Sequence, residues 1–586
     1  MNISRFVSIS LIISISILTD SFAQSQFTDE SLAAGLLSGN GHEGVAVGDY
    51  NNDGYDDLYI SSISGQNQCY RNNKDGTFTE VGGTLGLSLA QSTISQAAIW
   101  GDINNDGWVD LYVGNKSEQD RLFLNNAGNS FDEISFDAGI YQVGHPKSVN
   151  MADINNDGYL DIYVSNFGSE NAMYINNQNN TFTNYIYASG ALDSGEAMGT
   201  IFFDYDKDGD QDLYLVHDHL EPNLLYQNDG EGNFTDVSLE SGTNTMSYGM
   251  GVDVGDVNND GWQDIYIANF GQNYLLLNKG DGTFDDISVS AGVHDGGMGW
   301  GAFFFDYNRD GLIDIYTVNS VFPNQTNFPN VLYRNVGSNK FERDGQDTVI
   351  SAKNLSFGTA YLDFDLDGNL DVMVANRGED ESIQLLKNGE HIGNWLGLKL
   401  VGIESNVDAI GAKIKIVDQF NRLHYRELIT GQSWSSQNSK VQYFGLGSAV
   451  SLSSIELIWP SGNITNVPIP DLNAYYTIYE NGEIVTGLDN NLTSIMDNLK
   501  LNENFIDIFP NPSNGRFNVR INEDINEPVS VNIYDLVGRK VYYRQFEPSN
   551  RKINIDLNIK ELTSSNFLTV VITTKSSTYS KSLIID

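Results

Sequence analysis

The chain has 586 residues, of which 40% are hydrophobic, and a formal net charge of −45. This length allows several domains, and the hydrophobic content is sufficient for folded cores. The acidity argues against nucleic acid or an anionic membrane surface as a partner, because both attract basic faces. The single cysteine, Cys69, excludes an intrachain disulfide, and we expect it to be a buried strand residue.

The first 23 residues predict a secretory signal peptide. Arg5 precedes an apolar and serine-rich run from Phe6 to Leu18, and small residues lead to a cleavage site after Ala23. The run is too short to span a membrane, and no later stretch reaches about 18 uninterrupted apolar residues. We therefore expect an exported protein without a transmembrane segment after signal removal, either secreted or at the cell surface.

An acidic motif, Asp-x-Asn/Asp-x-Asp-Gly-x-x-Asp, organises the next part of the chain. It begins at Asp49 and occurs seven times, with 50–57 residues between successive first aspartates. A fixed period of this size indicates one supersecondary unit repeated as an array.

The oxygen spacing of the motif predicts calcium sites. Ca²⁺ prefers six to eight oxygen ligands at about 2.3–2.6 Å, here from side chains at positions 1, 3, 5 and 9 and the carbonyl of position 7, with glycine at position 6 permitting the turn. We expect up to seven structural ions, each stabilising the fold by about 1.4 kcal/mol at ten times its Kd. The predicted ligands are Asp49, Asn51, Asp53, Tyr55 and Asp57; Asp102, Asn104, Asp106, Trp108 and Asp110; Asp153, Asn155, Asp157, Tyr159 and Asp161; Asp204, Asp206, Asp208, Asp210 and Asp212; Asp256, Asn258, Asp260, Trp262 and Asp264; Asp306, Asn308, Asp310, Leu312 and Asp314; Asp363, Asp365, Asp367, Asn369 and Asp371.

Two other interpretations of this motif are less favoured. A metal-free Asx turn explains any single copy, because Asn, Asp and Gly are turn formers, but not seven copies with the same oxygen positions. An EF-hand needs a glutamate at position 12 and flanking helices, whereas this chain has residues such as Ile60 and Val113 there, within β-branched and aromatic runs. We therefore expect the metal loop to join two strands.

Each repeat predicts four antiparallel strands. An apolar strand enters the metal loop, a second leaves it, a third follows a polar connection, and an Asn/Gly hairpin leads to a fourth that opens at a phenylalanine such as Phe78 or Phe234. Four strands per period of about 50 residues is typical of a propeller blade. The last repeat lacks its fourth strand, and residues 27–31 match that missing strand, so we expect them to complete the seventh blade.

The repeats resemble the FG-GAP/VCBS repeats of integrin-α-like propellers. Residues from Asn394 onward resemble the ASPIC/UnbV domain, in segments such as Phe444–Gly447 and Trp459–Gly462. Together they resemble the cartilage acidic protein family, although Tyr443 stands where that family usually has histidine. The resemblance implies an all-β protein: a seven-bladed calcium-binding β-propeller (integrin-α-like) followed by a β-rich ASPIC/UnbV domain.

The end of the chain resembles a type IX secretion sorting domain, in segments such as Phe509–Pro512 and Lys581–Ile584. The resemblance implies a small C-terminal β-sandwich, a Bacteroidetes source and the type IX secretion machinery as a partner. The expected domains are 1–23, signal peptide; 24–390, propeller; 391–480, ASPIC/UnbV-like domain; 481–503, linker; and 504–586, sorting domain.

Function is expected on the rim opposite the metal loops. Recurrent asparagines there, such as Asn115 and Asn166, are typical of turn caps, while His217, Asp218, His219, His294, Trp300 and Arg377 could bind a ligand. We expect non-catalytic recognition of an extracellular glycan or protein; the alternative is a polysaccharide-active, lyase-like enzyme. A quinone-dependent dehydrogenase is disfavoured, because the chain has no vicinal cysteines and no repeated tryptophan motif.

Overall fold

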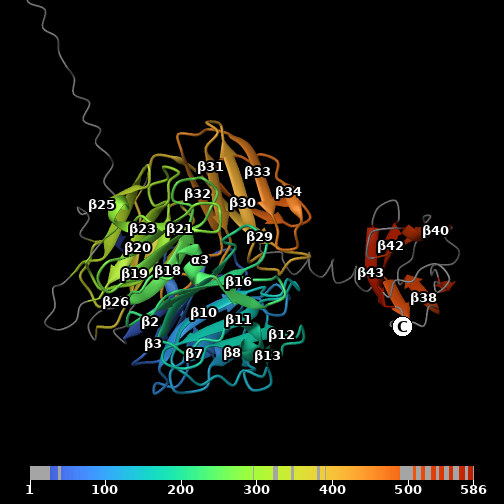
Figure 1. Ribbon diagram of the computed structural model, residues 1–586, viewed down its shortest axis with the longest axis horizontal. Helices are drawn as coiled ribbons and strands as arrows, with labels where there is room; N and C mark the ends of the chain where they lie inside the picture. The colour runs from blue at the N-terminus through green and yellow to red at the C-terminus, as the bar shows by residue number, and fades with distance from the viewer. Residues whose placement is uncertain are drawn as a thin grey trace, which may run out of the picture. The chain divides into compact units, whose positions relative to one another are not determined.

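The computed structural model (Figure 1) describes residues 27–36, 41–294, 296–320, 328–344, 349–378, 383–389 and 391–488, together with strands between 506 and 584. The chain divides into two compact units, 1–489 and 490–586. The predicted signal peptide lies outside the described residues.

Within the described part of the first unit, the acidic repeats form seven four-stranded antiparallel sheets. The strands of the first three sheets are β2 (His42–Gly48), β3 (Asp57–Ser62), β4 (Gln68–Asn72) and β5 (Phe78–Glu80); β6 (Ser95–Gly101), β7 (Asp110–Asn115), β8 (Arg121–Asn125) and β9 (Phe131–Glu133); and β10 (Pro146–Ala152), β11 (Asp161–Asn166), β12 (Ala172–Asn176) and β13 (Phe182–Asn184). The next three sheets contain β14 (Ala197–Phe203), β15 (Asp212–His217), β16 (Leu224–Asn228) and β17 (Phe234–Asp236); β18 (Gly249–Gly255), β19 (Asp264–Asn269), β20 (Tyr274–Asn278) and β21 (Phe284–Asp286); and β22 (Gly299–Phe305), β23 (Asp314–Asn319), β24 (Val331–Gly337) and β25 (Lys340–Asp344).

The seventh sheet combines strands from the two ends of the repeat region. It contains β26 (Ser356–Leu362), β27 (Asp371–Asn376), β28 (Gln384–Lys387) and, at its edge, β1 (Thr28–Asp29). β1 pairs antiparallel with β28, with Thr28 opposite Lys387. The N-terminal strand therefore occupies the outer position that other repeats fill with their own fourth strand.

The first strand of each sheet contacts the first strand of the next sheet, and β26 contacts β2. Apolar side chains fill the spaces between sheets: Trp100 of β6 is fully buried between Tyr50 and Tyr59 of the first repeat. Aromatic and β-branched residues favour these strands because they pack well on a pleated surface.

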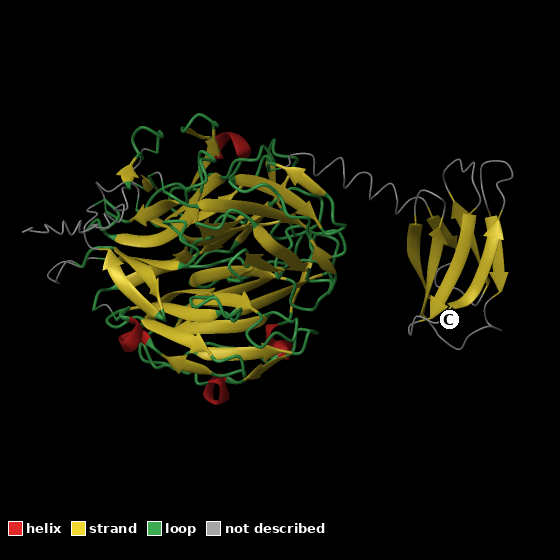
Figure 2. Cartoon of the chain, turned by 90° about the horizontal axis from the view of Figure 1, so that it is seen from above, coloured by secondary structure: helices red, strands yellow, loops and turns green. Residues whose placement is uncertain are grey.

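Four one-turn helices follow the fourth strands of four sheets and lie at the outside of the first unit (Figure 2). They are α1 (Gly82–Leu85), α2 (Ile186–Ser189), α3 (Ser238–Ser241) and α4 (Ser288–Ala291). Each ends at a left-handed glycine, such as Gly86 with φ of 82°, because glycine adopts this conformation at little cost.

Two further four-stranded sheets complete the first unit. One has the order β32–β29–β35–β36 and the other β31–β30–β33–β34. Their bounds are β29 (Asn394–Val401), β30 (Lys413–Asp418), β31 (Leu423–Glu427), β32 (Gln442–Gly447), β33 (Leu452–Ile458), β34 (Ile464–Asn466), β35 (Ala474–Tyr479) and β36 (Ile484–Thr486). β36 pairs with β35 and lies inside the segment 481–503 that was predicted as a linker, because a turn at Gly482 returns the chain as a hairpin.

These two sheets pack against the repeats. Leu398, Phe444 and Trp459 share one hydrophobic core with Met151 and Leu160 of the third repeat. The sequence left open whether this region packs on the repeats or stands apart; the shared core shows that it packs on them.

The segment Thr430–Ser439, here called the inserted segment, runs between β31 and β32 and hydrogen-bonds to the first strands of several sheets. Ser433 exchanges backbone hydrogen bonds with Val252 at 2.9 and 3.3 Å, and Gln437 bonds to Val45 and Val47 at 2.9 and 3.1 Å. These bonds satisfy inner-strand groups that no neighbouring strand of the same sheet reaches.

Glycines in the first strands make room for the inserted segment. A Cβ on Gly44 would lie 1.9 Å from the carbonyl oxygen of Ser435, and one on Gly301 would lie 2.8 Å from Oγ of Ser433. Real Cβ atoms do not approach so closely, so these positions require glycine if the segment is to stay in place.

The described elements of the second unit are all strands. Its strands form the sheets β37–β38–β41 and β40–β39–β42–β43. They are β37 (Ile506–Phe509), β38 (Arg516–Ile521), β39 (Val529–Asp535), β40 (Lys540–Phe546), β41 (Asn554–Asn558), β42 (Phe567–Thr573) and β43 (Thr578–Ile584). Among the described residues of the whole chain, no helix has the length and apolarity needed to cross a membrane.

Candidate metal sites

The first aspartate of each acidic loop folds the loop around its own carboxylate. In the first repeat, Asp49 accepts hydrogen bonds from the backbone N–H groups of Asp53 and Gly54, both at 2.9 Å. Asp153 and Asp306 receive the equivalent bonds in their repeats. The sixth residue is always a left-handed glycine, with φ of 87° at Gly54, so the turn closes without a Cβ clash.

The last aspartate of each loop is anchored by an asparagine that lies in the third strand or directly after it. Asp57 accepts a bond from the backbone N–H of Asn72 at 2.8 Å, and Asp314 accepts one from Asn335 at 2.7 Å. Both aspartates are fully buried. A carboxylate that is buried and held on one oxygen presents its other oxygen in a fixed direction.

Several of these oxygens have no hydrogen-bond donor. They are Oδ1 of Asn51, Oδ2 of Asp57, Oδ1 of Asp204, Oδ2 of Asp314 and Oδ1 of Asp365. A buried acceptor without a donor is costly unless a cation binds it. The hard oxygen donors therefore fit a calcium ion, which would be held in these loops and neutralise their charge.

In two loops the structure brings the predicted acidic ligands directly together. One carboxylate oxygen from each of Asp204, Asp206, Asp208 and Asp212 lies within 4.8 Å of the others, and the same holds for Asp363, Asp365 and Asp371. In the second, third and fifth loops the position-3 asparagine instead donates to the position-5 aspartate, as Asn104 does to Asp106 at 3.1 Å. The carbonyl ligands expected at position 7 remain predictions.

Burial and mutual repulsion disfavour the charged forms of these acids. Burial raises the pKa of Asp102 to about 8 and that of Asp306 to about 7. Burial and the neighbouring aspartates hold the pKa of Asp57 and of Asp314 well above the usual range. A bound cation would relieve both effects.

Residues outside the repeats also reach three of the loops. Lys413 of β30 lies 2.7 Å from Oδ2 of Asp204, and the hydroxyl of Tyr475 donates to Oδ2 of Asp363. The backbone N–H of Asp102 donates to Asp408 at 2.8 Å. The two sheets formed by β29–β36 are therefore attached to the repeats at the acidic loops themselves.

The third-strand asparagines have a second role that the sequence analysis missed. Their Nδ2 groups donate to the position-2 carbonyl of the preceding repeat's loop: Asn125 to Tyr50 at 2.9 Å, and Asn176 to Ile103 at 2.7 Å. The same bond joins Asn72 to Phe364 of the last repeat at 2.8 Å. The sequence has an asparagine at the same place in every repeat, which could have indicated this role, but the sequence analysis interpreted it only as part of a hairpin.

A second link runs the other way. Position 4 is left-handed in all seven loops, and in the first, second and fifth loops its asparagine donates to the glycine carbonyl of the next loop, as Asn52 does to Gly107 at 2.7 Å and Asn105 to Gly158 at 2.8 Å. In the sixth repeat Arg309 replaces the asparagine and donates to Gly368 at 3.1 Å. These four loops are therefore each joined to the next loop by a direct hydrogen bond.

On the opposite rim, many of the proposed ligand-binding side chains are engaged within the fold. His217 is buried and lies 3.2 Å from Asp193. Arg377 pairs with the buried Glu43 and stacks on Phe357, with its guanidinium 3.5 Å from the ring centre. The recurrent asparagines cap turns, as Asn166 does by donating to the Glu170 carbonyl at 3.1 Å.

Cys69 is buried with a free thiol.

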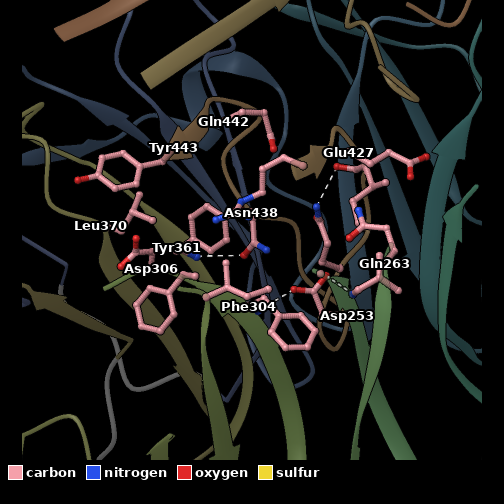
Figure 3. A pocket seen from close by; sticks show the side chains of 17 residues that line it. Asp253, Gln263, Phe304, Asp306, Tyr361, Leu370, Glu427, Asn438, Gln442 and Tyr443 are labelled. Atoms are coloured by element: carbon pink, nitrogen blue, oxygen red, sulfur yellow. Dashed lines mark hydrogen bonds between the residues drawn. The ribbon is translucent and has the colours of Figure 1, made fainter. Parts of the chain in front are cut away.

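A cavity of about 40 Å³ lies between the repeats and the inserted segment (Figure 3). Oε1 of Gln263 and Nδ2 of Asn438, which line it, have no hydrogen-bond partner. Asp253 accepts hydrogen bonds from Phe304 and Val254 at 2.8 and 2.9 Å. The cavity is polar and has room for a few water molecules, but not for a sugar ring.

Comparison with known protein families identifies three parts of the chain. An FG-GAP-like repeat model matches 49–113, 102–164, 153–215, 204–267 and 256–317. An ASPIC and UnbV model matches 402–485, and a secretion system C-terminal sorting domain model matches 507–586.

Similar curated proteins include two cartilage acidic proteins. Cartilage acidic protein 1 of Xenopus tropicalis is 24% identical over 482 residues, which are 72% of this chain and 70% of that protein. The Homo sapiens protein is 27% identical over 201 residues, which are 32% of this chain and 30% of that protein.

Two solved structures are more distantly similar. Sqt1 of Saccharomyces cerevisiae shares 10% identity over 63% of this chain and 99% of its own, with a TM-score of 0.39. PorZ, a surface component of the type-IX secretion system of Porphyromonas gingivalis, shares 10% identity over 92% of this chain and 75% of its own, with a TM-score of 0.25. The chain thus combines FG-GAP-like repeats with an ASPIC and UnbV domain and a secretion system C-terminal sorting domain, and it is similar to the cartilage acidic proteins.

Proposed function

We propose that this chain is a calcium-stabilised, seven-bladed β-propeller that is exported by the type IX system and recognises an extracellular glycan or protein. The sorting domain supports export to the surface or the extracellular space. The signal peptide and the Bacteroidetes source remain predictions from the sequence. The recognition surface is the rim opposite the acidic loops, because those loops are covered in part by the ASPIC and UnbV domain.

Closure of the propeller is supported by two sets of contacts. The first strands of the seven sheets contact one another in succession, with β26 against β2. The Asn72–Phe364 hydrogen bond joins the first and last repeats in the same way as the bonds that join neighbours. A closed ring leaves no sheet without a neighbour.

Calcium binding is supported by the unpartnered oxygens. Oδ2 of Asp57 and Oδ2 of Asp314 are buried, lack a donor and belong to carboxylates held in position by backbone hydrogen bonds. Their role would be structural. Each ion would stabilise the folded state by mass action, which matters for an exported chain without disulfides.

Recognition is supported by an arc of aromatic rings on the opposite rim, here called the aromatic arc. His145, Phe167, His219, Tyr248 and Phe270 follow one another edge to face, with ring centres 5.6–6.2 Å apart. Phe270 is 39% exposed. Exposed aromatic rings of this kind supply contact area at binding surfaces, and this observation carries the proposal.

The lyase-like alternative rests on the histidines, acids and arginine of the same rim. His217 and Arg377 are both held by acidic partners, the half-buried Asp193 and the buried Glu43, which favours positioning over acid–base chemistry. Incubating the protein with uronate-containing polysaccharides tests the alternative directly. If the wild type steadily forms unsaturated product and His217→Ala does not, the protein is an enzyme, and the proposal of non-catalytic recognition is wrong.

Binding to arrays of glycans and matrix proteins, with and without chelator, tests the proposed function. We expect the arrays to contain a ligand for which Phe270→Ser has an affinity about tenfold or more below that of the wild type. Loss of an anchoring aromatic side chain costs more than about 1 kcal/mol of binding free energy. Phe136→Ser is the matched control, since Phe136 is 71% exposed and lies outside the arc. Equal binding by both variants would contradict the use of this surface.

A further inference from the structure

A second group of metal-ligating side chains lies at the opposite ends of the strands from the acidic loops. It consists of Glu196, just before β14, with Asp218 and His219, just after β15. One ligand atom from each residue lies within 4.8 Å of the other two. No part of the repeat motif supplies these residues, so the group is separate from the predicted calcium sites.

Backbone hydrogen bonds hold the three residues together. The N–H of Asp218 donates to the carbonyl of Glu196 at 3.0 Å, and the N–H of His219 donates to Oδ1 of Asp218 at 2.7 Å. Nδ1 of His219 contacts Oε2 of Glu196, and its Nε2 lies 3.9 Å from Oδ2 of Asp218. The group is therefore arranged before any ligand arrives.

The surroundings of the group favour a cation. Oε2 of Glu196, which Nδ1 of His219 contacts, is a buried atom. Glu221 lies beside it and accepts the N–H of Glu196 at 2.9 Å. The carboxylates of Glu196, Asp218 and Glu221 therefore outnumber the two basic groups beside them, His219 and Lys147, and the remaining negative charge attracts a positive ion.

We propose that Glu196, Asp218 and His219 bind a divalent transition-metal ion of the Zn²⁺ class. An imidazole nitrogen with two carboxylates suits zinc and its neighbours, whereas Ca²⁺ takes six to eight oxygens. The His219 side chain is 55% exposed, so at least one coordination position faces solvent. A water molecule or a ligand oxygen could occupy that position, beside the rings of Phe167 and Tyr248.

Titration with Co²⁺ in the presence of excess Ca²⁺ tests this proposal on the full chain. Calcium occupies oxygen-only sites, and bound Co²⁺ reports nitrogen and oxygen ligation by its visible absorption. We expect one equivalent of Co²⁺ to bind the wild type and Zn²⁺ to displace it. His219→Ala and Glu196→Gln should each weaken Co²⁺ binding about tenfold or more.

His294→Ala is the matched control, because His294 is an exposed histidine in the corresponding connection before β22. It should bind Co²⁺ as the wild type does. Thermal melting in Ca²⁺ establishes that each variant is folded. The proposal is overturned if the wild type binds no Co²⁺ under these conditions, or if His219→Ala and Glu196→Gln retain its affinity. Neither result would bear on calcium binding by the acidic loops.

Discussion

Nδ2 of Asn72 donates a hydrogen bond of 2.8 Å to the carbonyl of Phe364, across 292 residues of sequence. This bond joins the third strand of the first repeat to the acidic loop of the last repeat. Because the backbone N–H of Asn72 also holds Asp57, a single residue connects the ring contact with a predicted calcium ligand. A change at Asn72 should therefore affect both the contact between the first and last repeats and the position of Asp57.

Asn72→Ala should destabilise the repeat region. The side chain is buried, so its loss leaves the Phe364 carbonyl without a donor, at a cost of about 1–3 kcal/mol. Urea unfolding in excess Ca²⁺ measures the change. Asn73→Ala is the control, because that side chain bonds within its own hairpin, to Thr77 and Thr79. Equal losses in both variants would argue against a special role for the junction.

Asp314→Asn should have opposite effects with and without calcium. With Ca²⁺ at ten times its Kd, loss of one site should lower the free energy of unfolding by about 1.4 kcal/mol and the stoichiometry by one ion. In EDTA the same change removes one acid from the repelling group of Asp306, Asp310 and Asp314, so the variant should be more stable than the wild type.

Calorimetric titration and thermal melting measure these two quantities. Asp75→Asn, in an exposed hairpin, should change neither. Uptake of the same number of ions by the wild type and Asp314→Asn would count against a site in the sixth loop.

Asp253→Asn should change the pH dependence of stability. Burial raises the pKa of Asp253 to about 7 in the folded protein, above its ordinary value of 3.8. A raised carboxyl pKa means that the folded state holds its proton longer, so the wild type loses stability as the pH rises from about 4 to 7 and stays level above that. Asparagine has no carboxyl group to titrate, so the stability of the variant does not fall in this way.

The free-energy difference between variant and wild type should therefore shift by about 4 kcal/mol in favour of the variant between pH 4 and pH 8. The lost hydrogen bond from Phe304 or Val254 offsets the whole curve and leaves its slope unchanged. Urea unfolding at several pH values in excess Ca²⁺ provides the measurement. Parallel curves for the two proteins would show that Asp253 does not titrate in this range.

Gly44→Ala should displace the inserted segment. The new Cβ would lie 1.9 Å from the Ser435 carbonyl, so backbone must move, at a cost of about 1–3 kcal/mol or more. Limited proteolysis should then cut within Thr430–Ser439, which the wild type protects. Gly83→Ala meets no atom within 4 Å and should behave as the wild type. Protection of the segment in Gly44→Ala would exclude the predicted displacement.

The sequence predicted those features that are local along the chain. The seven acidic loops and the four-strand repeats follow from residue spacing, because loop ligands and hairpins lie within a few residues of one another, whereas the sorting domain followed from its resemblance to a known family. The edge pairing of Thr28 with Lys387 was also predictable, since residues 27–31 match a strand that the last repeat lacks.

Only the tertiary structure shows which distant parts of the chain contact one another. Ser433 reaches Val252, Tyr475 reaches Asp363 and Lys413 reaches Asp204, each across a separation that carries no sequence period. Glu196 and His219 likewise come together only because β14 and β15 are antiparallel neighbours. Sequence spacing reports contacts made by one stretch of chain with itself, whereas these contacts depend on which distant stretches pack together.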